Sequence, residues 1–129
     1  MAVVGIGTDA VEIARVRAAV TRTPGLLDRL FTEAEQSACR SDCGELRFGG
    51  LAARFAAKEA VAKALGTGVR GFGFRDVEVL PDDLGRPTVT LHDRAQQVAA
   101  DHGVDRVHVS LTHTRDLAVA HALAEGRAE

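Results

Sequence analysis

One stretch with helical character, residues 51–65, constrains the fold of this chain more than any other segment. It is rich in alanine, which favours helices, and Gly66 follows it as a typical helix stop. Both lysines of the chain, Lys58 and Lys63, lie in this stretch, whereas every other fixed positive charge is an arginine. A lysine ammonium is a compact charge that suits a single phosphate oxygen, so the placement points to a site. The alternative is that two lysines fall in one helix by chance.

Glu59 lies on an apolar face of this predicted helix. The residues three, four or seven positions from it, which share its face, are Ala52, Phe55, Ala56, Ala62 and Lys63. Burial of an ionised carboxylate is costly unless cations or donors compensate it, and an exposed Glu–Lys pair contributes only about 0.3–0.5 kcal/mol. We therefore expect Glu59 and Lys63 in a site, with a surface pair at the rim of a core helix as the alternative. Lys58 is off this face and is expected to face away from Glu59 or to lie at the rim, as a helix former.

The size of the chain predicts one domain over residues 1–129, because 129 residues with 46% hydrophobic content suit one core. No apolar run is long enough to span a membrane, and the first residues lack the basic start and cleavage site of a signal peptide. We expect a cytoplasmic protein with no membrane partner. Cys39 and Cys43 fit neither a CxxC redox pair nor a zinc site, so we expect incidental thiols.

The charge distribution argues against nucleic acid as a partner and indicates a local basic face. The formal net charge is −2, and the chain has no Trp or Tyr on which bases would stack. Between residues 13 and 31 there is one acid, Asp28, and the arginines are Arg15, Arg17, Arg22 and Arg29. Arg15 and Arg22 are one heptad apart and would share a side of the first predicted helix if it runs that far, so they predict a dock for an acidic partner. A solvated helix face is the alternative.

Helical and strand-like patterns are interspersed along the chain. Helices are expected at 12–20, from Pro24, from a capping box at Thr32, at 51–65 and at 93–102. Strands are expected at 3–8, 77–80, 87–91, 106–110 and 117–123, with loops at 39–50 and, rich in glycine, at 66–74. Strands outside βαβ repeats favour an α+β fold, with a largely antiparallel sheet packed with a long central helix.

Three places carry polar residues at the ends of expected elements. Asp9 follows the first strand, residues 66–68 follow the helix of Glu59 and Lys63, and residues 110–113 end a later strand. Taken singly, each fits ordinary structure, namely a helix cap, a helix stop and a turn histidine. Their combination is what points to a function.

Together these segments resemble the acyl-carrier-protein synthase family, the small bacterial 4′-phosphopantetheinyl transferases. Residues 5–15 (GIGTDAVEIAR) are similar to the family's opening motif, residues 54–64 (RFAAKEAVAKA) to its central helix and residues 109–113 (VSLTH) to its closing motif, with LGRP at 84–87 between. Thr112 stands where a serine is common, a change that keeps the hydroxyl. Residues 21–50 carry no motif of the family.

The resemblance implies a transferase. The 4′-phosphopantetheine group would pass from coenzyme A to a serine of apo acyl carrier protein, with release of adenosine 3′,5′-bisphosphate, in fatty-acid or polyketide biosynthesis. Asp9 and Glu59 would hold Mg²⁺ against the pyrophosphate, and Lys63 would point at the same oxygens. Two carboxylates about 5 Å apart repel by about 3 kcal/mol at a dielectric of about 20, so a cation lets them converge. Mg²⁺ prefers such oxygen ligands.

The general base is left open by this pattern. Glu59, Asp9 or a metal-bound water would each be able to remove the serine proton, and we favour Glu59 acting through water. A non-catalytic module that binds coenzyme A or a nucleotide, with the same fold, is the alternative function. Asp9, Glu59 and Lys63 together argue against it.

The resemblance also assigns residues to coenzyme A and to partners. Those implied at the 3′-phosphate are Arg54, His113 and Thr114, with Pro87 near the adenine. The backbone N–H groups of residues Gly66, Thr67 and Gly68 are expected to approach phosphate. Members of the family look like homotrimers with coenzyme A between subunits, so one copy needs a neighbour to complete its site. Acyl carrier proteins are acidic, so the resemblance implies that one of them binds the face of Arg15 and Arg22.

Overall fold

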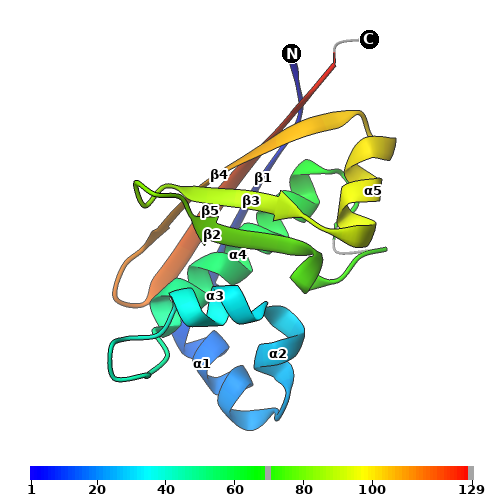
Figure 1. Cartoon of the computed structure of the whole chain (residues 1–129). Coiled ribbons are helices and arrows are strands. Elements are labelled where there is room, and N and C mark those ends of the chain that lie inside the picture. The colour runs from blue at the N-terminus through cyan, green and yellow to red at the C-terminus, as the bar shows by residue number, and fades with distance from the viewer. Residues whose placement is uncertain (69–70, 128–129) are drawn as a thin grey trace.

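Two antiparallel sheets and a central helix make up the computed structural model in Figure 1, which describes residues 1–68 and 71–127. The larger sheet has the strand order β1–β5–β4, and its strands are β1 (Ala2–Glu12), β5 (Leu117–Gly126) and β4 (Val104–His113). The strands of the smaller sheet, a hairpin, are β2 (Val77–Pro81) and β3 (Pro87–Leu91). The expected α+β class with antiparallel pairing is confirmed, although the strands divide into two sheets.

The helices lie close to their expected positions. Those in the described residues are α1 (Ile13–Arg22), α2 (Leu26–Leu30), α3 (Glu33–Ala38), α4 (Phe48–Ala64) and α5 (Asp93–Asp101), with a 3-10 turn at Phe74–Asp76. The predicted capping box is present, since Thr32 and Glu35 exchange side-chain and backbone hydrogen bonds. Gly66 follows α4 with φ of +84°, a conformation that glycine adopts readily. Residues 69–70 of the expected glycine-rich loop lie outside the described residues.

Helix α4 forms the centre of the core. Ten of its 17 residues are buried, most of them alanines. It packs between the three-stranded sheet and the β2–β3 hairpin (Figure 1). The inward face of β5 is a row of buried alanines, namely Ala118, Ala120, Ala122 and Ala124. Small side chains on both elements let the helix and the sheet approach closely.

Several element boundaries differ from the prediction. Strand β1 was expected at 3–8 but continues to Glu12, because it pairs with β5 along nearly its whole length. Asp9 therefore lies inside a strand rather than at its end. Helix α4 begins at Phe48, within the expected loop 39–50, where Arg40 and Leu46 also form a β-bridge. Pro24 precedes α2, which begins at Leu26.

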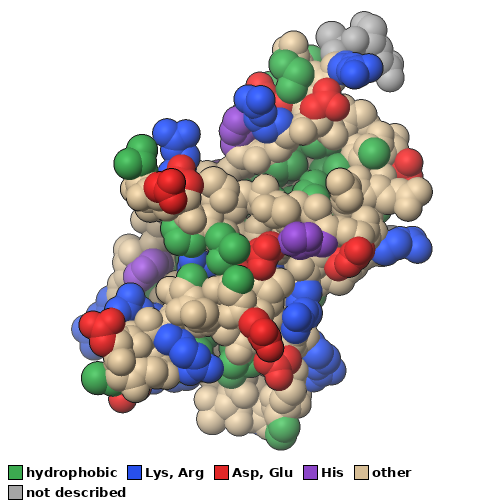
Figure 2. Space-filling model, in the orientation of Figure 1, with side chains coloured by type: hydrophobic (Ala, Val, Ile, Leu, Met, Phe, Trp, Pro, Cys, Tyr) green, Lys and Arg blue, Asp and Glu red, His purple; other side chains and the backbone are tan. Residues whose placement is uncertain are grey.

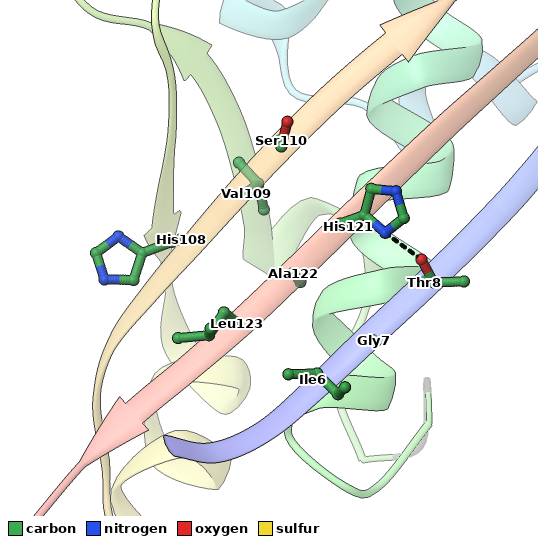
Figure 3. A pocket seen from close by; sticks show the side chains of 9 residues that line it. All are labelled: Ile6, Gly7, Thr8, His108, Val109, Ser110, His121, Ala122 and Leu123. Carbon is green, nitrogen blue, oxygen red and sulfur yellow. Dashed lines mark hydrogen bonds between the residues drawn. The ribbon is translucent and has the colours of Figure 1, made fainter. Parts of the chain in front are cut away.

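Two faces of the molecule differ in their exposed side chains. On the face shown in Figure 2, acidic and basic side chains are interspersed. The outer face of the three-stranded sheet is seen in Figure 3, where Thr8 and His121 are hydrogen-bonded and Ile6 and Leu123 lie nearby. Ile6 is 72% exposed, an unusual fraction for a large apolar side chain in a strand. No helix in the described parts of the chain is long and apolar enough to cross a membrane.

Candidate active site

Asp9, Glu59 and Lys63 meet where β1 packs against the C-terminal half of α4. Lys63 Nζ lies 3.3 Å from Asp9 Oδ1 and donates a hydrogen bond of 2.8 Å to the Thr8 carbonyl oxygen. Glu59 lies one turn before Lys63 on α4. Burial and the charge of Asp9 raise the pKa of Glu59, while the charge of Lys63 lowers it. The structure thus brings together three predicted residues, although Asp9 and Lys63 are 54 positions apart.

This group of side chains fits a magnesium ion. Its two carboxylates are near enough for the charge of Asp9 to act on Glu59, and a cation would relieve that repulsion. The Asp9 side chain is 22% exposed and Glu59 is half-buried, so both remain accessible to solvent. Within residues 1–68 and 71–127 there is no group of three or more His, Cys, Asp or Glu side chains that would enclose a metal. Two carboxylates suit Mg²⁺, which usually keeps water and substrate oxygens as further ligands.

The loop after α4 uses its N–H groups to end the helix. The N–H group of Gly66 donates to the Lys63 carbonyl, and those of Thr67 and Gly68 both donate to the Ala62 carbonyl. These N–H groups therefore satisfy the free carbonyls at the end of the helix, as helix stops commonly do. These N–H groups are thus engaged by the helix end in this structure, and their approach to phosphate stays a prediction. The loop still follows Lys63 directly and borders the site.

A second group of polar residues lies on the opposite face of α4. Arg54 Nε donates to the Val79 carbonyl in β2 at 3.0 Å, whereas Lys63 reaches β1. From Arg54 to Lys63, nine helical positions at about 100° each place the two side chains about half a turn apart. Arg54 and His113 line one hollow together with Arg47. Two guanidinium groups and a histidine in one hollow suit an anion such as phosphate.

Local packing places these side chains. A Cβ atom at Gly49 would lie 2.8 Å from the His113 ring, so this glycine lets the ring pack on the first turn of α4. Thr114 shapes the turn between β4 and β5, because its N–H donates to the Leu117 carbonyl and its hydroxyl accepts from the Leu117 N–H. Pro87 lies apart from this hollow, opposite Pro81 at the start of β3.

Arg47 is a residue that the sequence reasoning missed. It directly precedes α4, in the stretch 21–50 that carries no recognised motif. Its spacing is the signal that would have found it, because Arg47 and Arg54 are two helical turns apart and fall on one side of the helix start.

A groove between α1 and α2 contains the predicted basic residues. Arg15 and Arg22 both line it, so the expectation that they share a side of the first helix is confirmed. The rest of the lining is apolar and includes Phe55 and Phe74, whose rings stack with centroids 5.5 Å apart. A groove with an apolar floor and two arginines suits an acidic partner that also offers apolar side chains.

Lys58 faces away from Glu59, one of the two expected placements, but it is buried rather than exposed at the rim. It is 1% exposed and forms an ion pair of 2.8 Å with Glu35, which is fully buried. Its ammonium also donates to the Phe74 and Val77 carbonyls, and Glu35 accepts from the Val79 N–H. Burial lowers the pKa of Lys58, while the charge of Glu35 raises it. Lys58 therefore ties α4 to α3 and to the free edge of β2.

Comparisons with known proteins agree with this architecture. The family model for the 4′-phosphopantetheinyl transferase superfamily matches residues 5–122. A holo-[acyl-carrier-protein] synthase of Serratia proteamaculans is 48% identical over 98% of this chain and 100% of that protein, and one of Clostridium novyi is 46% identical over 95% and 88%. The structure of such a synthase from Neisseria meningitidis has a TM-score of 0.83 and 33% identity, over 96% of this chain and 99% of that one.

A structure with a bound ligand is also similar. Holo-[acyl-carrier-protein] synthase from Helicobacter pylori in complex with coenzyme A has a TM-score of 0.80 and 26% identity, over 93% of this chain and 99% of that one. The family match spans both groups of site residues, from Asp9 to His113. The chain therefore belongs to the 4′-phosphopantetheinyl transferase superfamily, among the holo-[acyl-carrier-protein] synthases.

Proposed function

We propose that this protein transfers 4′-phosphopantetheine from coenzyme A to a serine of an apo acyl carrier protein. The observation that carries the proposal is the convergence of Asp9, Glu59 and Lys63 from distant segments of a chain in this superfamily. The serine oxygen forms a bond to the phosphorus that bears the pantetheine arm. The bond from that phosphorus to the bridging oxygen breaks, and adenosine 3′,5′-bisphosphate leaves with that oxygen.

Three side chains carry the chemistry in this proposal. Asp9 and Glu59 hold Mg²⁺, which when bound would neutralise charge on the diphosphate. Lys63 turns its ammonium from Asp9 towards the same oxygens, where a compact charge stabilises the transition state. Glu59 accepts the serine proton through a water molecule.

The hollow on the other face of α4 would hold the 3′-phosphate of coenzyme A. Arg54, His113 and Thr114 take this role, and Arg47 adds a second guanidinium to the same hollow. Pro87 would border the adenine. The complex of the Helicobacter pylori relative with coenzyme A supports this ligand.

We propose a homotrimer in which each active site lies between two subunits. Because Arg54 and Lys63 point to opposite faces of α4, one protomer presents the two groups to different sides. The exposed apolar face around Ile6 (Figure 3) offers a surface for a second copy. Light scattering should give three times the protomer mass, and Ile6→Glu should yield a smaller, inactive species. A wild-type monomer with full activity would contradict this arrangement.

We place this single transferase domain, residues 1–129, in the cytoplasm. Both cysteines are free thiols, and burial raises the pKa of Cys39, which makes its thiol less reactive. Arg15 and Arg22 would dock the acidic carrier in the groove beside α1.

Mass spectrometry tests the transfer directly. Apo carrier incubated with the protein, coenzyme A and Mg²⁺ should gain the mass of one phosphopantetheine group. A carrier whose acceptor serine is replaced by alanine, and a reaction with chelator, are the controls. Coenzyme A binding without mass gain on fatty-acid or polyketide carriers would favour a non-catalytic binding module.

A further inference from the structure

Gly5 and Gly7 lie where β1 runs against α4. A Cβ atom at Gly7 would lie 1.9 Å from the Ala60 carbonyl oxygen, and one at Gly5 would lie 2.1 Å from that of Ala64. The obstructing atoms belong to the helix backbone and cannot rotate away. Neither glycine has a positive φ. These positions therefore need the absence of a side chain rather than the conformational freedom of glycine.

The two contacts lie next to the active-site residues on both the strand and the helix. Side chains alternate along a strand, so Gly5, Gly7 and Asp9 share the face of β1 that meets the helix. On α4, Ala60 directly follows Glu59 and Ala64 directly follows Lys63. One helical turn advances about 5.4 Å and two strand residues advance about 6.7 Å, so both contacts form together. Asp9 is the next residue on this face, beside Glu59 and Lys63.

We propose that Gly5 and Gly7 are positioning residues of the transferase, because their backbone contact with α4 sets the distance of Asp9 from Glu59 and Lys63. This inference rests on the proposed function and extends it to residues that touch no substrate. Cβ contacts below 3.0 Å essentially do not occur, so an alanine at Gly7 must push the strand and the helix apart by about 1 Å.

Such a shift would reach the active site directly. Lys63 reaches the Thr8 carbonyl at 2.8 Å and Asp9 at 3.3 Å only at the present separation of the two elements. Both carboxylates come from these same two elements, so their spacing widens with the shift. Displacing a supporting contact of a metal ligand costs about 10- to 100-fold in metal affinity. A displacement of about 1 Å at a catalytic group can lower the rate about 100-fold.

The test is Gly7→Ala, with Mn²⁺ as the probe. Free Mn²⁺ is followed by electron paramagnetic resonance during titration of the protein with coenzyme A present and no carrier. We expect Mn²⁺ affinity to fall about 10- to 100-fold. In the transfer assay, kcat at fixed Mg²⁺ should fall about 100-fold.

Gly126→Ala is the matched control. A Cβ atom there would lie 1.8 Å from the Gly103 carbonyl, an equal overlap in the same sheet. Gly126 pairs with Ala2, at the far end of β1 from the active site. This variant should lose stability in urea but keep wild-type Mn²⁺ affinity. A folded Gly7→Ala protein with wild-type affinity, or an equal loss of affinity in Gly126→Ala, would overturn the inference.

A second variant covers the case in which Gly7→Ala does not fold. Gly5→Ala meets Ala64, the last residue of α4, where the helix end can yield. It should fold and bind Mn²⁺ more weakly than wild type, and unchanged affinity would then refute the inference. If the wild-type protein modifies no carrier, the proposed function fails, whereas the Mn²⁺ titrations still decide whether the glycines set the spacing of the carboxylates.

Discussion

Lys63 pairs with Asp9 at 3.3 Å, from the last turn of α4 to the interior of β1. The Lys63 side chain is 52% exposed, and a pair this exposed contributes at most about 1 kcal/mol to stability. Its main effect is therefore to hold a positive charge beside two carboxylates.

Replacing Lys63 should separate activity from stability. We expect Lys63→Ala to lower kcat by about 100- to 1,000-fold, the usual effect of removing a donor that stabilises transition-state charge. The urea midpoint should shift little, because the lost pair is exposed. Lys63→Arg restores the charge with a planar group and should recover only part of the rate. Full activity in Lys63→Ala would remove Lys63 from the mechanism.

Glu59→Gln should abolish transfer and change the pH dependence of stability. Because burial and Asp9 raise the folded-state pKa of Glu59, its contribution to stability is present below the unfolded pKa and is lost as pH rises through the folded value. The variant should therefore gain stability relative to wild type as pH rises above the unfolded pKa of about 4.3, since an uncharged amide removes this loss. Urea unfolding in metal-free buffer measures the difference, and a constant difference would contradict the expectation.

Reversing the charges in the groove beside α1 should weaken carrier docking. Arg15→Glu and Arg22→Glu should each raise KM for the carrier about tenfold or more, since a close like charge costs above about 1 kcal/mol. KM for coenzyme A should stay at its wild-type value. Arg94→Glu, which makes the same charge change on α5, is the control and should leave both constants unchanged. Equal effects on the two substrates would reject the docking assignment.

His113→Ala should reduce discrimination between coenzyme A and 3′-dephospho-coenzyme A. If His113 contacts the 3′-phosphate, its removal costs about 1.5–3 kcal/mol with coenzyme A and nothing with the dephosphorylated analogue. Steady-state kinetics of the wild type and the variant with both donors give the coupling energy between His113 and the 3′-phosphate. A loss of equal size with both donors would place His113 elsewhere in the mechanism. This residue suits the test better than Arg54, which also supports β2 through the Val79 carbonyl.

Lys58 and Glu35 should couple strongly in stability. Lys58→Met or Glu35→Gln leaves its partner buried and uncompensated, and such changes cost about 3–5 kcal/mol. The double variant should lose less than the sum, because it leaves neither charge alone. Urea unfolding of the four proteins gives the coupling energy, and additive losses would show that the pair acts as two independent side chains.

Local pattern was enough for much of this fold. The capping box at Thr32, the glycine stop at Gly66 and most of the helix that ends there depend on neighbours within one or two turns, and these were predicted. The end of β1 was not predicted, because the extension of this strand to Glu12 depends on pairing with β5, more than a hundred positions away. Register between distant strands cannot be determined from alternation in one of them.

In the candidate site, too, residues with local signals were predicted and those that depend on distant partners were not. Helical spacing identified Glu59 with Lys63, and the family resemblance added Asp9, which the structure brings to Lys63. The burial of Lys58 was not predicted because its partner, Glu35, lies on another helix in a stretch without a motif. A buried lysine and an exposed one have the same sequence signal when the compensating acid is distant. The hydrogen bonds from the N–H groups of residues 66–68 to the helix end were not predicted, because the glycine pattern alone does not give their partners.

The two faces of α4 also have a consequence for genetics. In the proposed trimer, a site takes Glu59 from one subunit and His113 from its neighbour. A Glu59→Gln allele and a His113→Ala allele damage opposite halves, so a mixed trimer contains a junction where both halves are intact. Two defective copies of the gene in one cell would then restore some transfer, which is intragenic complementation. Two alleles damaged on the same face of the helix would not.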